Sequence, residues 1–304
     1  MSKAERPRGP QSVPSGESSP RQLSPDRSRV ILHPTDFTPT SFAAFAHALR
    51  LATYNQSELH ILHVAESEDE PPAWHEFPAV RHTLERWGMI PEYTDRHEVE
   101  KLSGVRVFKA NIHGNDVAEK VAEYVEVHAV DMVVLATGEH DDFLPRWFRR
   151  SVAESVLNTA KVPTLFVTHG ARGCVSEDDG KVTLDKILVP VDRTPRPDAA
   201  IERAMMALAA FGKEDSMLTL LHVGPEGPYP WPTWPEGFRW KSTQLLRQGR
   251  PADAILATAE EQGSDLIILV TDGADGFFDV LRGSTTQQIV RRAPCPVLAI
   301  PHDF

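Results

Sequence analysis

Arg29-Val-Ile-Leu-His-Pro-Thr-Asp36 is a short apolar run that ends in a proline, a threonine and an aspartate. This pattern predicts a buried strand followed by the loop at its carboxyl end. Lys186-Ile-Leu-Val-Pro-Val-Asp192 repeats the pattern in the second half of the chain. Two well-separated copies of one pattern indicate an internal repeat on the scale of a domain.

The two copies continue in the same order. Each is followed by an alanine-rich stretch with helical character, at 41–54 and 198–211, and then by a second strand that ends in Leu-His-Val. Further along, the predicted elements come in matched pairs: helices at 116–128 and 252–262, strands at 131–135 and 265–269, helices at 151–160 and 284–292, and closing strands at 162–167 and 295–300. Strands and helices therefore alternate through both copies.

This alternation predicts the fold class α/β, with two tandem, doubly wound domains, each built on a parallel sheet of about five strands. The length of 304 residues also suits two domains of roughly 150 residues. Residues 1–28 contain five prolines and few apolar side chains, which predicts a disordered tail. The expected boundaries are therefore a tail at 1–28, a first domain at 29–169, a linker at 170–184 and a second domain at 185–304.

The second copy is shorter than the first. The offset between the copies falls from 159 residues at the second strand to 135 residues at the glycine before the third helix, a loss of 24 residues. In the first copy this interval contains a candidate amphipathic helix around 76–87 and a strand at 105–110. In the second copy it contains the proline-rich segment 224–235, which excludes a regular helix. We expect Trp231 and Trp234 to cover the sheet face that the missing helix leaves open.

The loop after the fourth strand is the candidate phosphate site, because it leads into a helix whose first amide groups are unpaired. In the second copy this loop begins at Leu269 and contains Gly273, followed by Gly283-Ser284-Thr285 at the start of the helix. Glycines allow the backbone to approach a ligand, and a serine hydroxyl can bond a phosphate oxygen. The same residues also fit a simple turn and a helix cap, so the loop alone leaves both interpretations open.

Four features together resemble the universal stress protein family. They are a first strand ending in Pro-x-Asp, a second strand ending in Leu-His-Val, the loop pattern G-x2-G-x9-G-S/T, and a closing Ala-x-x-Pro-Val-type strand. The resemblance covers roughly residues 29–301 and implies a tandem member of the family. It implies the Rossmann-like fold called adenine nucleotide alpha hydrolase-like.

The resemblance also implies a nucleotide site in the second copy. The residues it assigns to the adenosine end are Asp192 and Val223, and those it assigns to the ribose and phosphates are Leu269, Val270, Gly273, Gly283, Ser284 and Thr285. The implied cofactor is ATP or a related adenosine nucleotide, with Mg²⁺ accompanying it. One departure is Val270, which stands where the family has its first glycine and could narrow the approach of the backbone to the ligand.

The first copy departs further from the family pattern. Asp36 and Val64 are retained, but the loop at 136–142 carries three acidic side chains, and Arg150 replaces the glycine before Ser151. Like charges repel a phosphate chain, and missing glycines crowd it. We therefore expect the first copy to have lost ATP binding and to serve as a structural partner.

Several classes of function are disfavoured by the sequence. The net charge of −11 opposes binding to nucleic acid or to anionic membranes. The sequence contains no Walker-type phosphate loop and no Gly-x-Ser-x-Gly nucleophile motif. His60 and His63 are three residues apart on a strand, so they point to opposite faces and do not suit a shared metal. Cys174 and Cys295 are interpreted as reduced and passive, and a cytoplasmic location is expected.

The main functional hypothesis is a stress-response regulatory protein that binds the nucleotide in its second copy. No catalytic residue or metal site is assigned, and the expected activity is at most a weak ATPase or autophosphorylation of Ser284. The alternative is an interaction module with both sites degenerate, which Val270 favours. A third reading, an adenylyl-transferring or electron-transfer relative, lacks its catalytic signatures. The expected partners are the nucleotide and an unidentified protein. Family members pair through their last strands, so the two copies are expected to pair through 164–167 and 297–300, and a homodimer of the whole chain is compatible with this pairing.

Overall fold

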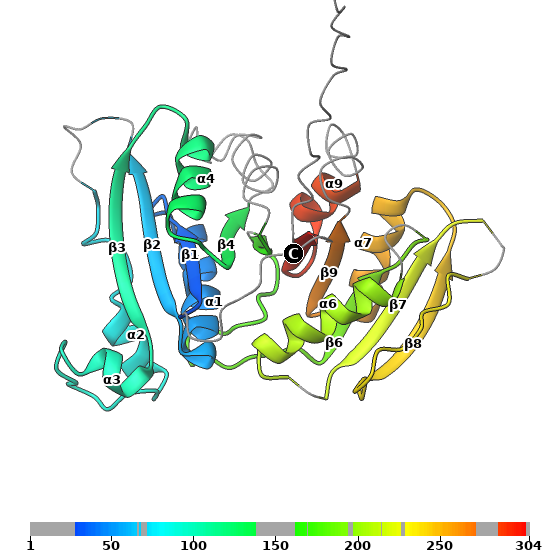
Figure 1. Cartoon of the computed structure of the whole chain (residues 1–304), viewed down its shortest axis with the longest axis horizontal. Helices are drawn as coiled ribbons and strands as arrows, with labels where there is room; N and C mark the ends of the chain where they lie inside the picture. Colours follow the sequence, from blue (N-terminus) through cyan, green and yellow to red (C-terminus); the bar gives the residue numbers. More distant parts are fainter. Residues whose placement is uncertain are drawn as a thin grey trace, which may run out of the picture.

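One continuous sheet organises the protein. The computed structural model describes residues 28–65, 67, 72–137, 162–168, 170–193, 197–213, 215–225, 229–271 and 285–301. Within these residues the sheet has ten strands, in the order β3-β2-β1-β4-β5-β10-β9-β6-β7-β8 (Figure 1). Each strand of the first half has its counterpart at the matching place in the second half, so the sequence repeat is also a structural repeat.

The elements follow the predicted alternation. In the first half they are β1 (Val30–Pro34), α1 (Pro39–Asn55), β2 (Glu58–Ala65), α2 (Val80–Arg86), α3 (Val99–Ser103), β3 (Arg106–His113), α4 (Val117–Val127), β4 (Met132–Thr137) and β5 (Thr164–Thr168). In the second half they are β6 (Lys186–Pro190), α6 (Pro197–Ala210), β7 (Met217–Val223), β8 (Lys241–Arg247), α7 (Pro251–Gln262), β9 (Leu266–Thr271), α9 (Thr285–Arg292) and β10 (Val297–Pro301). The predicted fold class is confirmed. The helix expected at 151–160 lies outside the described residues.

The two halves meet at the centre of the sheet. Strands within each half pair in parallel, whereas β5 and β10 pair antiparallel, with Leu165 opposite Leu298 and Phe166 opposite Val297. These are the closing strands whose pairing the family resemblance implied. An antiparallel pair between equivalent strands relates the halves by an approximate twofold axis, and we call this pair the seam.

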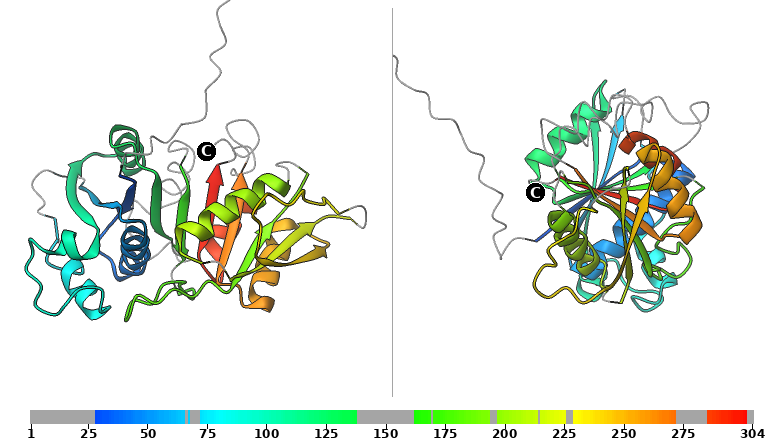
Figure 2. Two further views of the ribbon diagram at one scale, coloured as in Figure 1. Left: turned by 60° about the horizontal axis from the view of Figure 1, so that its bottom comes forward. Right: turned by 90° about the vertical axis from the view of Figure 1, so that its right-hand side faces the viewer.

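Two apolar layers cover the sheet. One contains α1 and α6, and the other contains α4, α7 and α9 (Figures 1 and 2). Successive residues of a strand enter opposite layers: Leu165 belongs to the first and Phe166 to the second. A sheet buried on both faces needs apolar side chains in both directions, which is why its strands are continuous apolar runs in the sequence.

The helix ends show why these segments are helical. Asp116 caps α4, accepting hydrogen bonds from the backbone N–H groups of Ala118 at 2.9 Å and Glu119 at 3.1 Å. Pro251 opens α7, and Gly263 ends it with a φ of 61°, a left-handed conformation that glycine adopts without strain. The helices predicted at 116–128 and 252–262 are therefore confirmed within one residue.

The segment between β7 and β8 differs from its prediction. Trp231 is 72% exposed and Trp234 is 40% exposed, so the expectation that these two residues cover the sheet was wrong. Tyr229, Phe238 and Trp240 pack against the α1/α6 layer instead. The hydroxyl of Tyr229 donates a hydrogen bond to the carbonyl of Leu220, 2.9 Å away, and this bond anchors the segment to β7.

Two elements of the first half also differ in extent. The helix expected around 76–87 is shorter, because α2 begins only at Val80 and the residues before it form turns. The strand expected at 105–110 continues to His113, paired with β2 along its whole length.

Candidate functional site

Those predicted nucleotide residues that the structure describes lie at the carboxyl ends of strands in the second half, or at the start of α9. Asp192 follows β6, Val223 ends β7, and Leu269 and Val270 lie near the end of β9. Because β9, β6 and β7 are neighbours and run parallel, their carboxyl ends share an edge of the sheet. Thr285 opens α9 and is half-buried. Gly273, Gly283 and Ser284 lie outside the described residues.

Asp192 presents an accessible carboxylate at this edge. Its side chain is 66% exposed, and its Oδ1 accepts a hydrogen bond from the backbone N–H of Arg193 at 2.7 Å. Nδ1 of His222 lies 3.8 Å from the same oxygen and 3.1 Å from the carbonyl oxygen of Val191. A carbonyl can only accept, so this ring nitrogen carries the proton that it donates to Val191. The imidazole thus holds the loop that carries Asp192.

The three apolar residues of the predicted site differ in exposure. Val223 is half-buried and packs on the α4/α7/α9 layer with part of its side chain accessible. Leu269 is buried in the same layer, whereas Val270 is half-buried against the α1/α6 layer. Leu269 therefore serves the core, whereas Asp192, Val223 and Val270 keep accessible surface.

The equivalent edge of the first half is covered. Oδ1 of Asp36 accepts hydrogen bonds from the N–H of Thr38 at 3.0 Å and from its hydroxyl at 2.6 Å, so this carboxylate closes its own loop. The next residue, Phe37, has a φ of 62°, which is a strained conformation for a bulky side chain. The centre of its ring lies 4.4 Å from the centre of the His63 ring and 5.0 Å from that of the Trp74 ring.

Five rings form an aromatic cluster at this edge: Phe37, Phe42, Phe45, Trp74 and Phe77. Phe77 is at its centre, packs edge-on against the other rings and is 4% exposed. Nζ of Lys109 lies 4.9 Å from the centre of the Trp74 ring, and burial lowers the pKa of this lysine. No sequence motif predicts this cluster. Its only sequence signal was the density of aromatic residues between 37 and 77.

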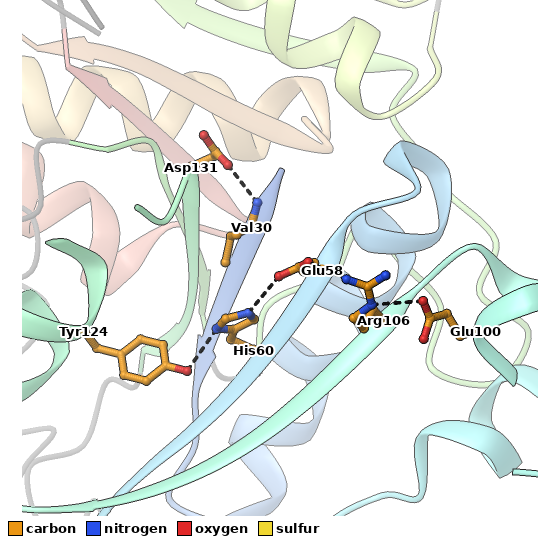
Figure 3. A network of polar contacts seen from close by, with 7 residues as sticks. All are labelled: Val30, Glu58, His60, Glu100, Arg106, Tyr124 and Asp131. Atoms are coloured by element: carbon orange, nitrogen blue, oxygen red, sulfur yellow. Dashed lines mark hydrogen bonds and ion pairs between the residues drawn. The ribbon is translucent and has the colours of Figure 1, made fainter. Parts of the chain in front are cut away.

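His60 and His63 point to opposite faces of β2, as their spacing predicts. Nδ1 of His60 is 2.9 Å from the hydroxyl of Tyr124 on α4, in a polar network that also contains Glu58 and Arg106 (Figure 3). Nδ1 of His63 donates to the carbonyl of Thr35 at 2.9 Å. Within the described part of the chain, no group of three or more His, Cys, Asp or Glu side chains is placed to hold a metal ion.

The two cysteines are buried thiols. Cys174 and Cys295 form no disulfide, and burial raises the pKa of both, that of Cys295 to about 12. A thiol that stays protonated at neutral pH is a poor nucleophile, which fits the passive role expected for both. As for membranes, none of the helices in the described residues is both long and apolar enough to span a bilayer.

Comparison with known proteins identifies related chains. A family model described as "Universal stress protein family" matches residues 28–168 and 241–301. The "Universal stress protein in QAH/OAS sulfhydrylase 3'region" of Thermus aquaticus is 46% identical over 56 residues, which span 18% of this chain and only 41% of that relative. Universal stress protein MJ0531 of Methanocaldococcus jannaschii is 24% identical over 147 residues, spanning 40% of this chain and 85% of that relative.

Solved structures match over nearly the whole chain. A crystal structure of a universal stress protein from Archaeoglobus fulgidus superimposes with a TM-score of 0.59 at 22% identity, covering 91% of this chain and 99% of the other. A functionally unknown protein, PA1789 of Pseudomonas aeruginosa, superimposes with a TM-score of 0.56 at 14% identity and covers 91% of this chain and 93% of the other. At these identities the likeness concerns the fold, and it extends over both halves.

Proposed function

This chain belongs to the universal stress protein family, and from that premise we propose that its second half binds an adenosine nucleotide, ATP or a close relative. The proposed site is the carboxyl edge of β6, β7 and β9. The observation that carries the proposal is the accessible pair Asp192 and Val223, at an edge whose counterpart in the first half is covered by the aromatic cluster. This contrast between the two halves supports a ligand site in the second half.

The residues at this edge fit the parts of such a ligand. The carboxylate of Asp192 can accept hydrogen bonds from adenosine N–H or O–H groups, and Val223 offers an apolar surface for a base. We assign Gly273, Gly283 and Ser284 to the phosphates, because glycine backbone and the amides at a helix start bind anions. Mg²⁺ would enter the site together with the nucleotide, bound to its negatively charged phosphates.

The proposed role is regulatory rather than catalytic. Occupancy of the second half would alter the surface that a partner protein contacts in a stress response, and hydrolysis or phosphorylation of Ser284 would be slow side reactions. We propose a cytoplasmic location, in keeping with the acidic net charge of −11. For the domain limits we propose those expected from the sequence, 29–169 and 185–304, with 170–184 as the linker.

A second candidate function is an interaction module without a nucleotide. The observation that favours it is Val270, a β-branched residue that stands in place of the family's first glycine and packs into the α1/α6 layer. In that case the two halves would act only as a built-in dimer joined at the seam.

Calorimetric titration of the full chain with ATP and Mg²⁺ distinguishes the two candidates. We expect saturable binding of one nucleotide per chain, lost in Gly283→Trp because an indole would occupy the phosphate position. Arg150→Trp is the matched control at the equivalent position of the first half, and it should bind ATP as the unchanged chain does. No heat at millimolar ATP, or equal loss in both variants, would contradict the proposal.

A further inference from the structure

The twofold repeat gives α1 and α6 equivalent positions on the same face of the sheet. Residues of α6 match those of α1 at an offset of 156, the difference between Asp36 and Asp192. The buried residues Ala44, Phe45, Ala48, Leu51 and Ala52 of α1 correspond to the buried residues Ala200, Ile201, Ala204, Ala207 and Leu208 of α6. Any space beside α1 should therefore have a counterpart beside α6.

The space beside α1 is filled by the connection between β5 and β6. Nε2 of His47 accepts hydrogen bonds from the backbone N–H groups of Cys174 at 3.1 Å and Val175 at 3.2 Å, and both of those side chains are buried. The connection is also tied to the second half, because Arg172 donates to Oδ1 of Asp265 at 3.0 Å. Residues 172–175 thus act as a plug between α1 and the amino edge of the second half.

The equivalent space beside α6 is a cavity of about 440 Å³. This volume is in the range of sites that hold small organic ligands. Its apolar wall contains Ile31, Leu51, Met132, Met206, Leu298 and Ile300. None of the residues predicted to bind the nucleotide lines it.

Three exchanges between equivalent residues distinguish the cavity from the plugged space. His47, Arg50 and Tyr54 of α1 correspond to Arg203, Met206 and Ala210 of α6, and all three α6 residues line the cavity. Alanine in place of tyrosine leaves room, and arginine in place of histidine adds a positive charge. The stretch before β1 that corresponds to the connection, residues 14–27, has one aliphatic side chain, Leu23. It therefore lacks the apolar side chains with which the connection fills its space.

The polar groups of the cavity come from both halves. Arg29 and Arg203 bring two guanidinium groups, and Asp131 brings one carboxylate, whose Oδ2 accepts a hydrogen bond from the N–H of Val30 at 2.7 Å (Figure 3). Ser57 is 1% exposed, and among the described residues its hydroxyl has no hydrogen-bond partner. Its counterpart before β7 is Ser216, at the offset of 159 residues that holds for the second strand of each copy. The hydroxyl of Ser216 donates to the carbonyl of Leu184 at 2.6 Å.

A buried hydroxyl without a partner is costly, and a ligand oxygen that accepted its hydrogen bond would remove that cost. Two guanidinium groups near one engaged carboxylate favour a ligand with a negative head group. The remaining wall is apolar and suits a hydrocarbon chain. We propose that this cavity binds an amphipathic carboxylate, with its head group near Arg203 and Ser57 and its chain against the strands beside the seam.

Titration calorimetry of the full chain with decanoate, below its micelle concentration, tests this proposal. We expect saturable binding of one decanoate per chain, weakened about tenfold in Arg203→Ala by loss of a charge-assisted hydrogen bond. Ala210→Tyr, which copies the residue of α1 into α6, should abolish binding by filling the cavity. Arg247→Ala removes an exposed arginine outside the cavity and should leave binding unchanged.

Ser57→Ala provides a second readout that does not depend on Ala210→Tyr folding correctly. It should weaken decanoate binding while leaving the ligand-free chain as stable as before or more so, because the removed hydroxyl has no partner to lose. Absence of saturable binding, or equal affinity in the unchanged chain, Arg203→Ala and Ser57→Ala, would overturn the proposal. Binding only after removal of residues 1–27 would overturn it too, by showing that this segment is the occupant.

Discussion

The carboxyl edges of the two halves began as copies and now differ in what covers them. In the first half, Asp36 bonds to Thr38, and the ring of Phe37 lies against Trp74. In the second half, Asp192 is 66% exposed, and the rings nearest to it are those of His222 and Tyr229, whose centres lie 5.9 Å apart. The same strand order therefore supports a filled edge and an accessible edge, and the difference depends on a few side chains in the connecting segments.

The largest expected effect comes from removing the centre of the aromatic cluster. Phe77→Ala should lower the free energy of unfolding by about 3 to 5 kcal/mol, because a fully buried ring leaves a cavity. Tyr229→Ala is the matched change in the second half and should cost only about 2 kcal/mol, since Tyr229 is half-buried. Urea denaturation of both variants measures the difference. Equal losses would show that the two edges are packed alike.

Acid should weaken the first half more than the second. Burial lowers the pKa of His33 and of His47 to about 4, and the residues at the equivalent positions of the second half, Val189 and Arg203, are not histidines. In the unfolded chain these two imidazoles become protonated below about pH 6.5. In the folded chain they become protonated only near pH 4. Stability should therefore be full above pH 6.5 and fall toward pH 4, by up to about 1.4 kcal/mol per pH unit for each histidine.

Hydrogen exchange at pH 7 and at pH 5 would locate this loss. Amides of α1 and β1 should lose protection first, because His33 donates to the carbonyl of Val134 and His47 accepts from the N–H groups of Cys174 and Val175. Protonation of His47 removes that acceptor. Uniform loss of protection across both halves would contradict this assignment.

A smaller effect separates the two aspartates. Asp36→Ala should lower the free energy of unfolding by about 1 kcal/mol, because it removes two hydrogen bonds to Thr38, and should leave ATP binding unchanged. Asp192→Ala should do the reverse, with stability almost unaffected and ATP affinity reduced about tenfold. Thermal unfolding with and without ATP measures both quantities. Reduced ATP affinity in Asp36→Ala would show that the first half also binds the nucleotide.

The smallest effect is expected at Val270. Val270→Gly restores the residue of the family pattern, and if the β-branched side chain restricts the backbone near the phosphates, ATP affinity should rise by a factor of about three. Leu269→Gly is a control for loss of core packing, and it should lower stability with no such gain. Unchanged or weaker ATP binding in Val270→Gly would show that the valine does not hinder the nucleotide.

The sequence predicted the parts of the fold that depend on local pattern. Buried parallel strands need apolar side chains on both faces, so 131–135 and 265–269 were recognisable as apolar runs. The helix predicted at 116–128 from its pattern begins after Asp116, which caps it in the structure. The placement of Asp192 beside Val223 followed from topology, because neighbouring parallel strands end at one edge.

Other features depend on tertiary contacts that sequence patterns do not encode. Trp74 and Phe77 lie in turns between β2 and α2, and only the folded chain shows that they meet Phe37. Trp231 and Trp234 were apolar enough to suggest burial, but both are exposed, and Trp240 takes the buried position. The cavity beside α6 depends on the path of the connection after β5, which packs beside α1 and leaves the equivalent space beside α6 open.

The seam has a consequence for how this protein can change over generations. In a dimer of two identical chains, a mutation is inherited on both sides of the twofold axis, so an aromatic ring that closes one site closes its twin as well. Here β5 and β10 belong to one polypeptide, and each side is encoded by its own stretch of gene. A loss of binding on one side can then become fixed while the other side stays under selection.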